Sequence, residues 1–475
     1  MKLEKSFLFF SSVLIVLLPF FLIKSATADA ACILIGILYL FFCIYKNNFD
    51  YFKNKFFYFF IIIYFYINLN SFFSSESEIS FLTSVPYLRI LLFIISLSFF
   101  FREQINLKKY FYYSFLICIL ILLIDSIYQI YTGHNILGYL AGEDSSRISS
   151  FFGNKLIMGS YTAKLLPLFI AIGFLLKFKK LNLFILIISS ILIVFSSERV
   201  ALLCLLITII AYLYLTFDLK KITYLILIFF TLFLSLYLFF PKNYNRIFVH
   251  TYQQLKETNN FLGLSYRHQL HFITAYRIFL DSKLIGHGIK TFRYLCDKPK
   301  FSVNDKIVND HSKKSPVEGK FILAIEGENK FARIVDDNNK VIFESETYDH
   351  TEFFVQSGDL VENGQKIYNS YEFKNGCNTH PHNIYLQFLS ELGIIGFLLF
   401  SSIFIYSFYL LVATFKRSFK SKLNNLEKCC FFTLLGIFTS MFPFFPSGNY
   451  FNNWMLIINY LPIGFYLSLV TKKNV

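Results

Sequence analysis

Residues 200–217 read VALLCLLITIIAYLYLTF, an apolar run without a charged side chain. Residues 222–240 form a second run of the same kind. A helix rises about 1.5 Å per residue, so a run of about 18–20 residues crosses a hydrocarbon layer of about 30 Å. Each of the two runs therefore predicts a helix that spans a membrane.

The composition of the whole chain leads to the same class of protein. Of its 475 residues, 55% are apolar and 20% are aromatic, whereas only 16% are charged. A water-soluble protein cannot bury this much Phe, Ile and Leu, because its surface remains too large relative to its volume. The composition excludes a disordered chain, a disulfide-rich miniprotein and almost any water-soluble enzyme. We expect an all-α polytopic membrane protein.

Further runs of this kind predict about twelve membrane spans in total. They are centred on 6–23, 26–45, 56–73, 81–101, 110–131, 160–176, 181–197, 199–217, 222–240, 384–414, 429–446 and 454–471. The chain then consists of a membrane domain at 1–240 with about nine spans, a long loop at 241–383, and a membrane domain at 384–475 with the remaining spans.

The net charge of +15 is unevenly distributed between the loops. Basic side chains gather in alternate loops, at Lys2, Lys5, Lys46, Lys53, Lys55, Arg102, Lys108, Lys109, Lys177, Lys179, Lys180, Lys220, Lys221, Lys416, Arg417, Lys420, Lys422, Lys428, Lys472 and Lys473. Because basic loops stay in the cytoplasm, we expect both termini there and the loop 241–383 on the outer face. The basic excess therefore reflects topology, and no nucleic-acid-binding role is expected.

Part of the long loop has the pattern of β-strands. From about 301 to 375, alternating runs such as FILAI at 321–325 and a turn at 336–339 predict a small β-rich module. Residues 357–367 resemble the turn-and-strand element of biotinyl/lipoyl-like modules. No lysine stands in a carrier-site hairpin, so we expect no prosthetic group.

The cysteines fit the same topology. Cys296 and Cys377 are the two that lie in the outer loop, and they flank the predicted β-rich module. A cysteine pair in an oxidising compartment predicts a disulfide, although two free thiols are the alternative. The other cysteines lie in spans or at their cytoplasmic edge, where buried reduced cysteine is common.

Ionisable residues within the predicted spans lie toward the outer ends of the helices. They are Arg89, Asp125, Lys164, Glu198, Arg199 and Glu391. All nine histidines also lie in outer loops, and His271 shares a polar helical face with Arg267. Ionisable groups are costly in hydrocarbon and often mark function, although basic side chains at an interface also simply extend toward water. The set as a whole predicts chemistry at the outer face of the membrane.

The last predicted loop runs directly into a span. Residues 379–396 read THPHNIYLQFLSELGIIG, in which Asn383 is a suitable N-cap for a helix that re-enters the membrane. The N-terminus of a helix disfavours an imidazolium ion, so His382 at this position is expected to be neutral and available as a base.

Residues 379–396 resemble the signature of the O-antigen ligase/polymerase superfamily of bacterial integral-membrane glycosyltransferases. Further segments resemble the family in the same order along the chain: RISSFFGN at 147–154, SSERVAL at 196–202, and SYR at 265–267 followed by DSKLIGHG at 281–288. The β-rich module is an addition to the family pattern, and His287 stands where a second small residue is more usual.

The resemblance implies a GT-C-like fold and a metal-independent, inverting glycosyltransferase without a cofactor. The donor would be a glycan on undecaprenyl diphosphate, and the acceptor a hydroxyl of lipid A–core, at the periplasmic face of the inner membrane. His382 would act as the general base, while Arg199 and Arg267 would bind the diphosphate. Further possible substrate contacts are His380, Arg147, Arg89 and Lys164.

Alternatives remain at this stage. O-antigen polymerases and protein O-oligosaccharyltransferases share these residues with ligases, and we favour a ligase because the histidine and arginine segments match its pattern. A zinc enzyme could use His380 and His382 together with His268 and His271, but no carboxylate or thiolate accompanies them. A flippase for lipid-linked sugars is the alternative that is not an enzyme, and it predicts two symmetric halves.

Overall fold

The structure, a computed structural model, describes the greater part of the chain. The described residues are 2–104, 106–142, 146–217, 223, 238, 240–258, 266–296, 298–301, 303, 320–326, 329–335, 340–345, 359–361, 365–369 and 376–470. Within them, the protein is mostly helical, and its helices pack around one large apolar core.

Ten helical stretches among the described residues are long and apolar enough to cross a membrane. They are α1 (Lys2–Phe21), α2 (Ser25–Lys46), α3 (Lys55–Phe72), the continuous stretch of α4 (Ser77–Ser84), η2 (Val85–Tyr87) and α5 (Leu88–Glu103), α6 (Leu107–Thr132), α7 (Met158–Leu175), α8 (Lys179–Ser196), α9 (Arg199–Thr216), α17 (Ile384–Ser418) and α19 (Asn453–Val470). Each coincides with a predicted span, so the prediction of a multi-pass membrane protein is confirmed.

Of the two remaining predicted spans, one corresponds to a shorter helix and the other lies largely outside the described residues. The range 429–446 corresponds to α18 (Asn425–Ser440), a helix of 16 residues that begins with a capping box between Asn424 and Glu427. The range 222–240 lies almost entirely outside the described residues.

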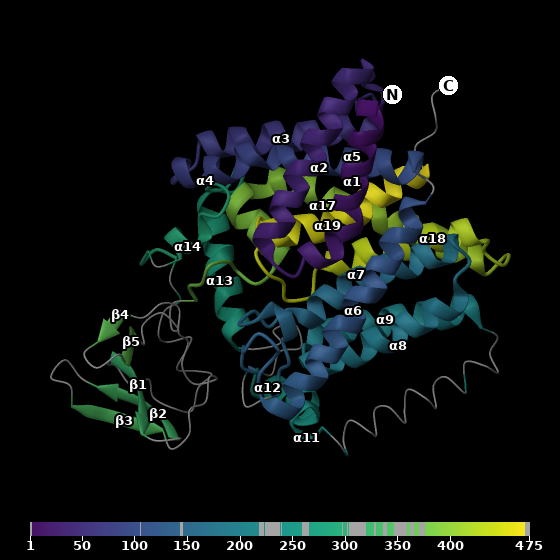
Figure 1. Cartoon of the computed structure of the whole chain (residues 1–475). Coiled ribbons are helices and arrows are strands. Elements are labelled where there is room, and N and C mark those ends of the chain that lie inside the picture. Colours follow the sequence, from purple (N-terminus) through teal and green to yellow (C-terminus); the bar gives the residue numbers. More distant parts are fainter. Residues whose placement is uncertain are drawn as a thin grey trace.

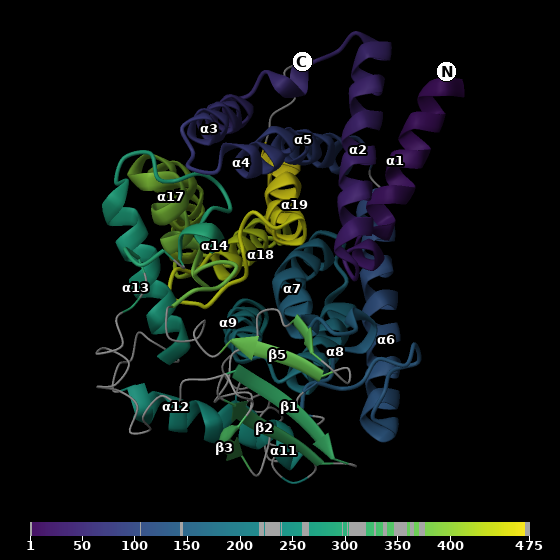
Figure 2. The ribbon, with the colours of Figure 1, turned by 90° about the vertical axis from the view of Figure 1, so that its left-hand side faces the viewer.

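The last helices of the chain complete the core formed by the first ones. α19 packs against α5 and α2, and α18 packs against α7 (Figures 1 and 2). Gly464 allows the close approach of α19 to α5, because a Cβ there would lie 2.9 Å from the Leu97 Cβ. The hydroxyl groups of Tyr87, Tyr450 and Tyr460 form a buried hydrogen-bonded chain at this contact.

Helix α17 is interrupted at Gly393, where the backbone has φ 64° and ψ −169°. Essentially only glycine adopts these angles. The backbone groups freed by the break are bonded by the segment 283–288, as Ile394 N donates to Lys283 O (2.8 Å) and Gly288 N donates to Glu391 O (2.8 Å). In a membrane protein such groups must find partners within the protein. The break therefore binds the segment after α13 tightly to α17.

Helix α3 holds the same junction from the other side. The Asn70 amide donates to Ile285 O (2.7 Å) and to Glu391 O (3.2 Å). The Tyr66 hydroxyl donates to Leu392 O. Side chains of α3 thus bond both the segment 283–288 and the break in α17, although these two segments lie more than 200 residues further along the chain.

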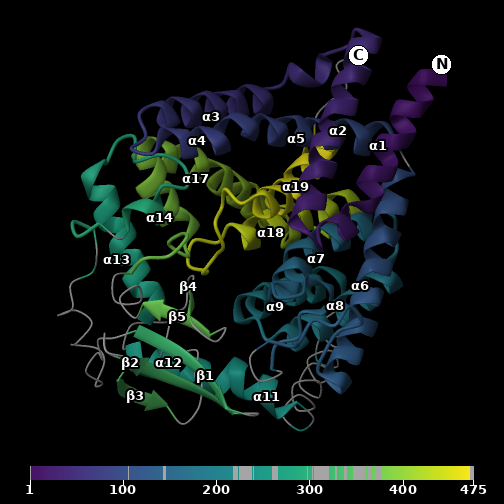
Figure 3. The same ribbon diagram turned by 60° about the vertical axis from the view of Figure 1, so that its left-hand side comes forward.

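The segment between the two membrane domains contains short helices and a sheet. The helical elements are α11 (Pro241–Tyr244), the π-helix η4 (Asn245–Val249), α12 (His250–Thr258), α13 (Tyr266–Asp281) and α14 (Phe292–Leu295). Figure 1 shows α13, α14 and the sheet at the left of the molecule, whereas the start of α1 lies at the upper right. Figure 3 shows the sheet below α13 in a turned view.

The sheet has five antiparallel strands in the order β3-β2-β1-β5-β4. The strands are β1 (Lys320–Glu326), β2 (Asn329–Val335), β3 (Val341–Ser345), β4 (Asp359–Val361) and β5 (Gln365–Asn369). All lie within 301–375, the range in which the sequence predicts strands, whereas the predicted turn at 336–339 lies outside the described residues.

A disulfide joins Cys296 to Cys377, the pair that the sequence predicts, with their Cα atoms 4.9 Å apart. It closes a loop with a sequence separation of 81 residues that contains the whole sheet. Both cysteines are buried in a small apolar cluster with Ala275 and Ile278 of α13 and with α14. The disulfide therefore anchors both ends of the sheet-containing segment to α13.

We predict that Gly393→Ala destabilises the folded protein strongly. A Cβ at this position would lie 2.6 Å from the Ile285 nitrogen, and the required φ is unfavourable for alanine. The expected loss of unfolding free energy is more than about 2 kcal/mol, measured as a lower melting temperature of the purified protein in detergent. Gly436→Ala is the control, because a Cβ there would have its nearest neighbour at 3.5 Å; equal melting temperatures for the two variants would contradict the prediction.

We also predict that the disulfide stabilises the protein. Removal of a disulfide that closes a long loop typically costs roughly 2–4 kcal/mol. Reductant should therefore lower the melting temperature of the wild type. The Cys296→Ser/Cys377→Ser double variant should have a lower melting temperature than the oxidised wild type, and reductant should not change it. A wild type that is insensitive to complete reduction, verified by thiol titration, would be evidence against this role.

Candidate functional site

Four histidines gather where α13 meets the start of α17. His268 and His271 come from α13, and His380 and His382 come from the loop before α17. The ring of His382 is central, because its centroid lies 4.2 Å from that of His380, 5.2 Å from that of His268 and 5.3 Å from that of His271. We call these four residues the histidine cluster.

The helical repeat of α13 brings two of these rings to the same place. His268 and His271 are one turn apart, so both lie on the side of α13 that faces the loop. Leu270, Ala275 and Ile278 are buried on α13, and this helix packs against α17. His271 is itself only 6% exposed, so the packing of α13 buries part of the histidine cluster.

The backbone around His382 is held in an uncommon conformation. His382 has φ 55°, and its carbonyl accepts a hydrogen bond from Ser447 N (2.8 Å). Asn383 caps α17, as the sequence predicts, by accepting from Tyr385 N (3.0 Å) and Leu386 N (3.1 Å). A non-glycine residue with positive φ is unfavourable unless its surroundings impose it. The cap and the segment after α18 together impose the position of the His382 ring.

Hydrogen bonds assign the protons of two rings in the histidine cluster. His271 Nδ1 lies 2.8 Å from Gly376 O, and His380 Nε2 lies 3.2 Å from Ser447 O. A carbonyl oxygen only accepts, so each of these ring nitrogens carries a proton and donates it. The opposite nitrogen of each neutral ring is then an acceptor.

Burial keeps His380 and His382 neutral. Burial lowers the pKa of His380 to about 4. Burial, and then the neighbouring His380, His268 and His271, lower the pKa of His382 well below its usual value. The charged form loses hydration and faces other imidazoles, which explains the direction of the shift. His382 is therefore a neutral imidazole at physiological pH.

A separate polar site lies at the start of α9. Arg199 is the first residue of α9, and its guanidinium donates to Arg246 O of η4 (3.2 Å). Glu198 directly before it accepts from Gly159 N (2.7 Å) and Ser160 N (3.1 Å). Glu198 thus satisfies free amides in the first turn of α7, which fixes the ends of α7 and α9 side by side.

The segment that begins at Arg147 packs against this site. Ile148 N donates to Phe195 O (3.1 Å), and the Ser197 hydroxyl donates to Ser146 O (2.7 Å). The Arg147 guanidinium donates to Leu156 O (3.0 Å), in the loop before α7. The structure therefore brings together two of the sequence segments that resemble the glycosyltransferase family, 147–154 and 196–202.

The remaining predicted site residues have different surroundings. Arg267 lies in the first turn of α13, next to His268 in the chain, and its side chain lies outside the described residues. Arg89 connects helices by donating to Asp29 Oδ1 and to the Asn453 side chain. Lys164 donates to Asn459 Oδ1 (3.0 Å) and lies near the last carbonyl of α18. The contacts of Arg89 and Lys164 are those of residues that hold helices together.

Sequence reasoning missed Asn378 and the segment 441–452 as parts of the site. Asn378 contacts two rings of the histidine cluster, and Ser447 bonds both the His382 backbone and the His380 ring. Neither belongs to a motif, although the position of Asn378 directly after Cys377 is a signal that could have been used. Within the described residues, no three His, Cys, Asp or Glu side chains are arranged to hold a metal ion.

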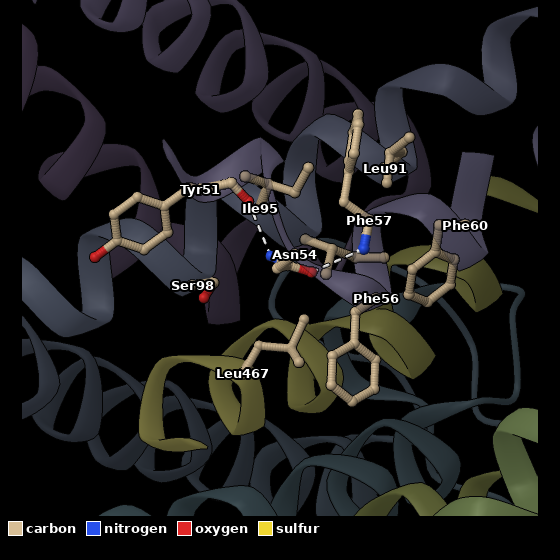
Figure 4. A pocket seen from close by; sticks show the side chains of 10 residues that line it. Tyr51, Asn54, Phe56, Phe57, Phe60, Leu91, Ile95, Ser98 and Leu467 are labelled. Atoms are coloured by element: carbon tan, nitrogen blue, oxygen red, sulfur yellow. Dashed lines mark hydrogen bonds between the residues drawn. The ribbon is translucent and has the colours of Figure 1, made fainter. Parts of the chain in front are cut away.

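A pocket elsewhere in the protein lacks groups suited to catalysis. Figure 4 shows it between α3, α5 and α19. Its lining is mostly apolar and consists of Tyr51, Asn54, Phe56, Phe57, Phe60, Leu91, Ile94, Ile95, Ser98 and Leu467. The Asn54 side chain is engaged in capping α3 and in bonding the Tyr51 carbonyl. The histidine cluster is thus the stronger candidate for a functional site.

Comparison with known proteins identifies no family for this chain. No protein-family model matches it, and no curated protein matches it either. The fold and the site define a multi-pass membrane protein with a cluster of four histidines beside a membrane helix, and the functional argument rests on these residues.

Proposed function

We propose that the protein is an O-antigen ligase-type glycosyltransferase of the bacterial inner membrane. It transfers a glycan from undecaprenyl diphosphate to an acceptor hydroxyl, such as that of lipid A–core, at the periplasmic face. The observation that carries the proposal is the neutral His382 ring at the start of α17, within the segment 379–396 that resembles the family signature. A neutral imidazole at a membrane surface is suited to remove a proton from a hydroxyl group.

In the proposed reaction, His382 acts as a general base. The acceptor oxygen attacks the anomeric carbon, the bond from that carbon to the diphosphate oxygen breaks, and the acceptor proton moves to His382. The carbon is attacked from the side opposite the leaving group, so its configuration inverts. Base assistance of this kind typically contributes about 10²–10⁴-fold in rate. Diphosphate leaves without protonation if positive groups neutralise its charge, and no metal is required for this step.

Arg199 and Arg267 are the proposed diphosphate ligands. Arginine keeps its charge at all relevant pH values and binds phosphate oxygens in pairs. Arg199 stands at the N-terminus of α9, where the helix dipole also favours an anion. Arg267 is adjacent in the chain to His268 of the histidine cluster. The position of Arg267 supports a diphosphate near the histidine cluster, whereas Arg199 is assigned from its place at the start of α9 and from the family resemblance.

The arrangement of the chain supports the proposed topology. The start of α1 lies at the upper right of Figure 1, and α13, α14 and the sheet lie at the left. The proposed topology has about twelve spans in a GT-C-like fold, with α18 and the range 222–240 included, both termini in the cytoplasm and the histidine cluster in the periplasm.

The first test is transfer in vitro, with EDTA present throughout. We expect purified protein to transfer glycan from undecaprenyl diphosphate to lipid A–core, and His382→Ala to lower the rate by at least about 100-fold. His134→Ala is the control, because His134 lies in a different loop beside Tyr128. Full activity of His382→Ala would overturn the mechanism. If wild-type protein yields no product, a second lipid-linked glycan as acceptor tests the polymerase alternative.

The arginine assignment gives an independent prediction. Arg199→Gln should lower kcat/KM for the lipid-linked donor by about 10–100-fold, since a charged hydrogen bond to phosphate is lost. The apparent affinity for the acceptor should change little. Arg102→Gln removes the same charge at the end of α5 and should leave both parameters unchanged; an equal loss in both variants would show a general effect of charge.

A further inference from the structure

Asn378 enters the histidine cluster from a rigid part of the chain. It directly follows Cys377 of the disulfide, and its carbonyl contacts Cys296 Sγ (3.7 Å). The residue is only 7% exposed. The disulfide therefore fixes the backbone from which the Asn378 carboxamide reaches the imidazoles.

The orientation of this carboxamide is determined by its neighbour in the chain. Thr379 N donates to Asn378 Oδ1 at 2.6 Å, so this end of the carboxamide is the oxygen. The amide nitrogen then faces the rings, 3.0 Å from His382 Nε2 and 3.5 Å from His271 Nε2. An amide nitrogen only donates, so both ring nitrogens must present lone pairs.

An independent hydrogen bond agrees with this assignment. His271 Nδ1 donates to Gly376 O, which leaves its Nε2 as the acceptor in the neutral ring. Asn378 therefore meets two lone pairs, and the neutral form of His382 has its proton on Nδ1. Protonation of His382 Nε2 would place one N–H against another.

The other groups that face His382 do not favour a proton either. They are His268 and His271 from α13 and His380 from its own loop. Arg293 of α14 adds positive charge near His380. The Asn378 carboxamide selects which nitrogen of His382 carries the lone pair.

We infer that Asn378 is a positioning residue that presents the His382 Nε2 lone pair and occupies the place of the acceptor hydroxyl before substrate binds. This inference rests on the proposed function and deepens it. The acceptor O–H replaces the amide N–H at Nε2, and its proton moves to Nε2 as the acceptor oxygen bonds to the anomeric carbon. The imidazolium that results then loses its proton to water, and the Asn378 amide returns.

The isosteric variant Asn378→Asp tests the inference. It replaces a donor by a negatively charged acceptor, which stabilises the imidazolium form of His382. We expect the acidic limb of the pH profile of kcat/KM to move upward by at least about one pH unit, so that activity is lost at a higher pH than in the wild type. A merely structural defect would lower activity without moving this limb.

Asn424→Asp is the matched control, because Asn424 caps α18 at an exposed position outside the histidine cluster. Its pH profile should equal that of the wild type. Asn378→Ala is a second variant, which removes the donor without adding charge and should shift the limb in the same direction but by less. If Asn378→Asp does not fold, Asn378→Ala alone decides, and an unmoved limb overturns the inference.

A chemical-modification experiment without substrate tests the role of Asn378 independently of the proposed transfer reaction. The rate at which diethyl pyrocarbonate modifies His382 is measured against pH, with His382→Ala as the reference that assigns the signal. We expect His382 to react as a neutral base to lower pH in the wild type than in Asn378→Asp. Equal titration in both proteins overturns the role of Asn378, whatever the transfer assay gives. A shifted titration without any transfer supports the positioning role and rejects the proposed reaction.

Discussion

The hydrogen bonds at the break in α17 are the constraint on which the rest of the structure depends. A helix that is interrupted inside an apolar bundle must place its freed backbone groups on other protein groups. Here the segment 283–288 supplies the partners, and Asn70 of α3 bonds both sides of the contact. Because this segment directly follows α13, the break fixes α13 against α17. The histidine cluster is a consequence, since its rings come from α13 and from the loop directly before α17.

The site shows how burial and hydrogen bonding act in the same direction. Removal of water from the rings disfavours the imidazolium form, and the neighbouring imidazoles add no negative charge to offset this. The carbonyl groups of Gly376 and Ser447 meanwhile assign protons to two rings. A base with a pKa this low gives up some proton affinity, but it is uncharged and ready over the whole physiological range.

The sequence predicts the elements of this protein better than the contacts between them. Apolar runs identify the spans, and an asparagine before an apolar run identifies the cap of α17. The break at Gly393 has no such signal, because no proline marks it and the glycine is flanked directly by Leu392 and Ile394. The contact between Asn378 and His271 joins residues 107 positions apart, and only the folded chain reveals it. The role assigned to Arg267 rests on the sequence alone, because its side chain lies outside the described residues.

The disulfide has a consequence for how this chain can change during evolution. Its two Cα atoms are 4.9 Å apart, so the chain leaves the helical body and returns to it at almost the same point. Insertions, deletions or a complete replacement between the two cysteines would leave the path of the remaining chain unaltered. Such a closed side loop can diverge quickly while the residues at its base stay constant. Lineages that share the histidine cluster can therefore differ in this segment without any change in the framework that holds it.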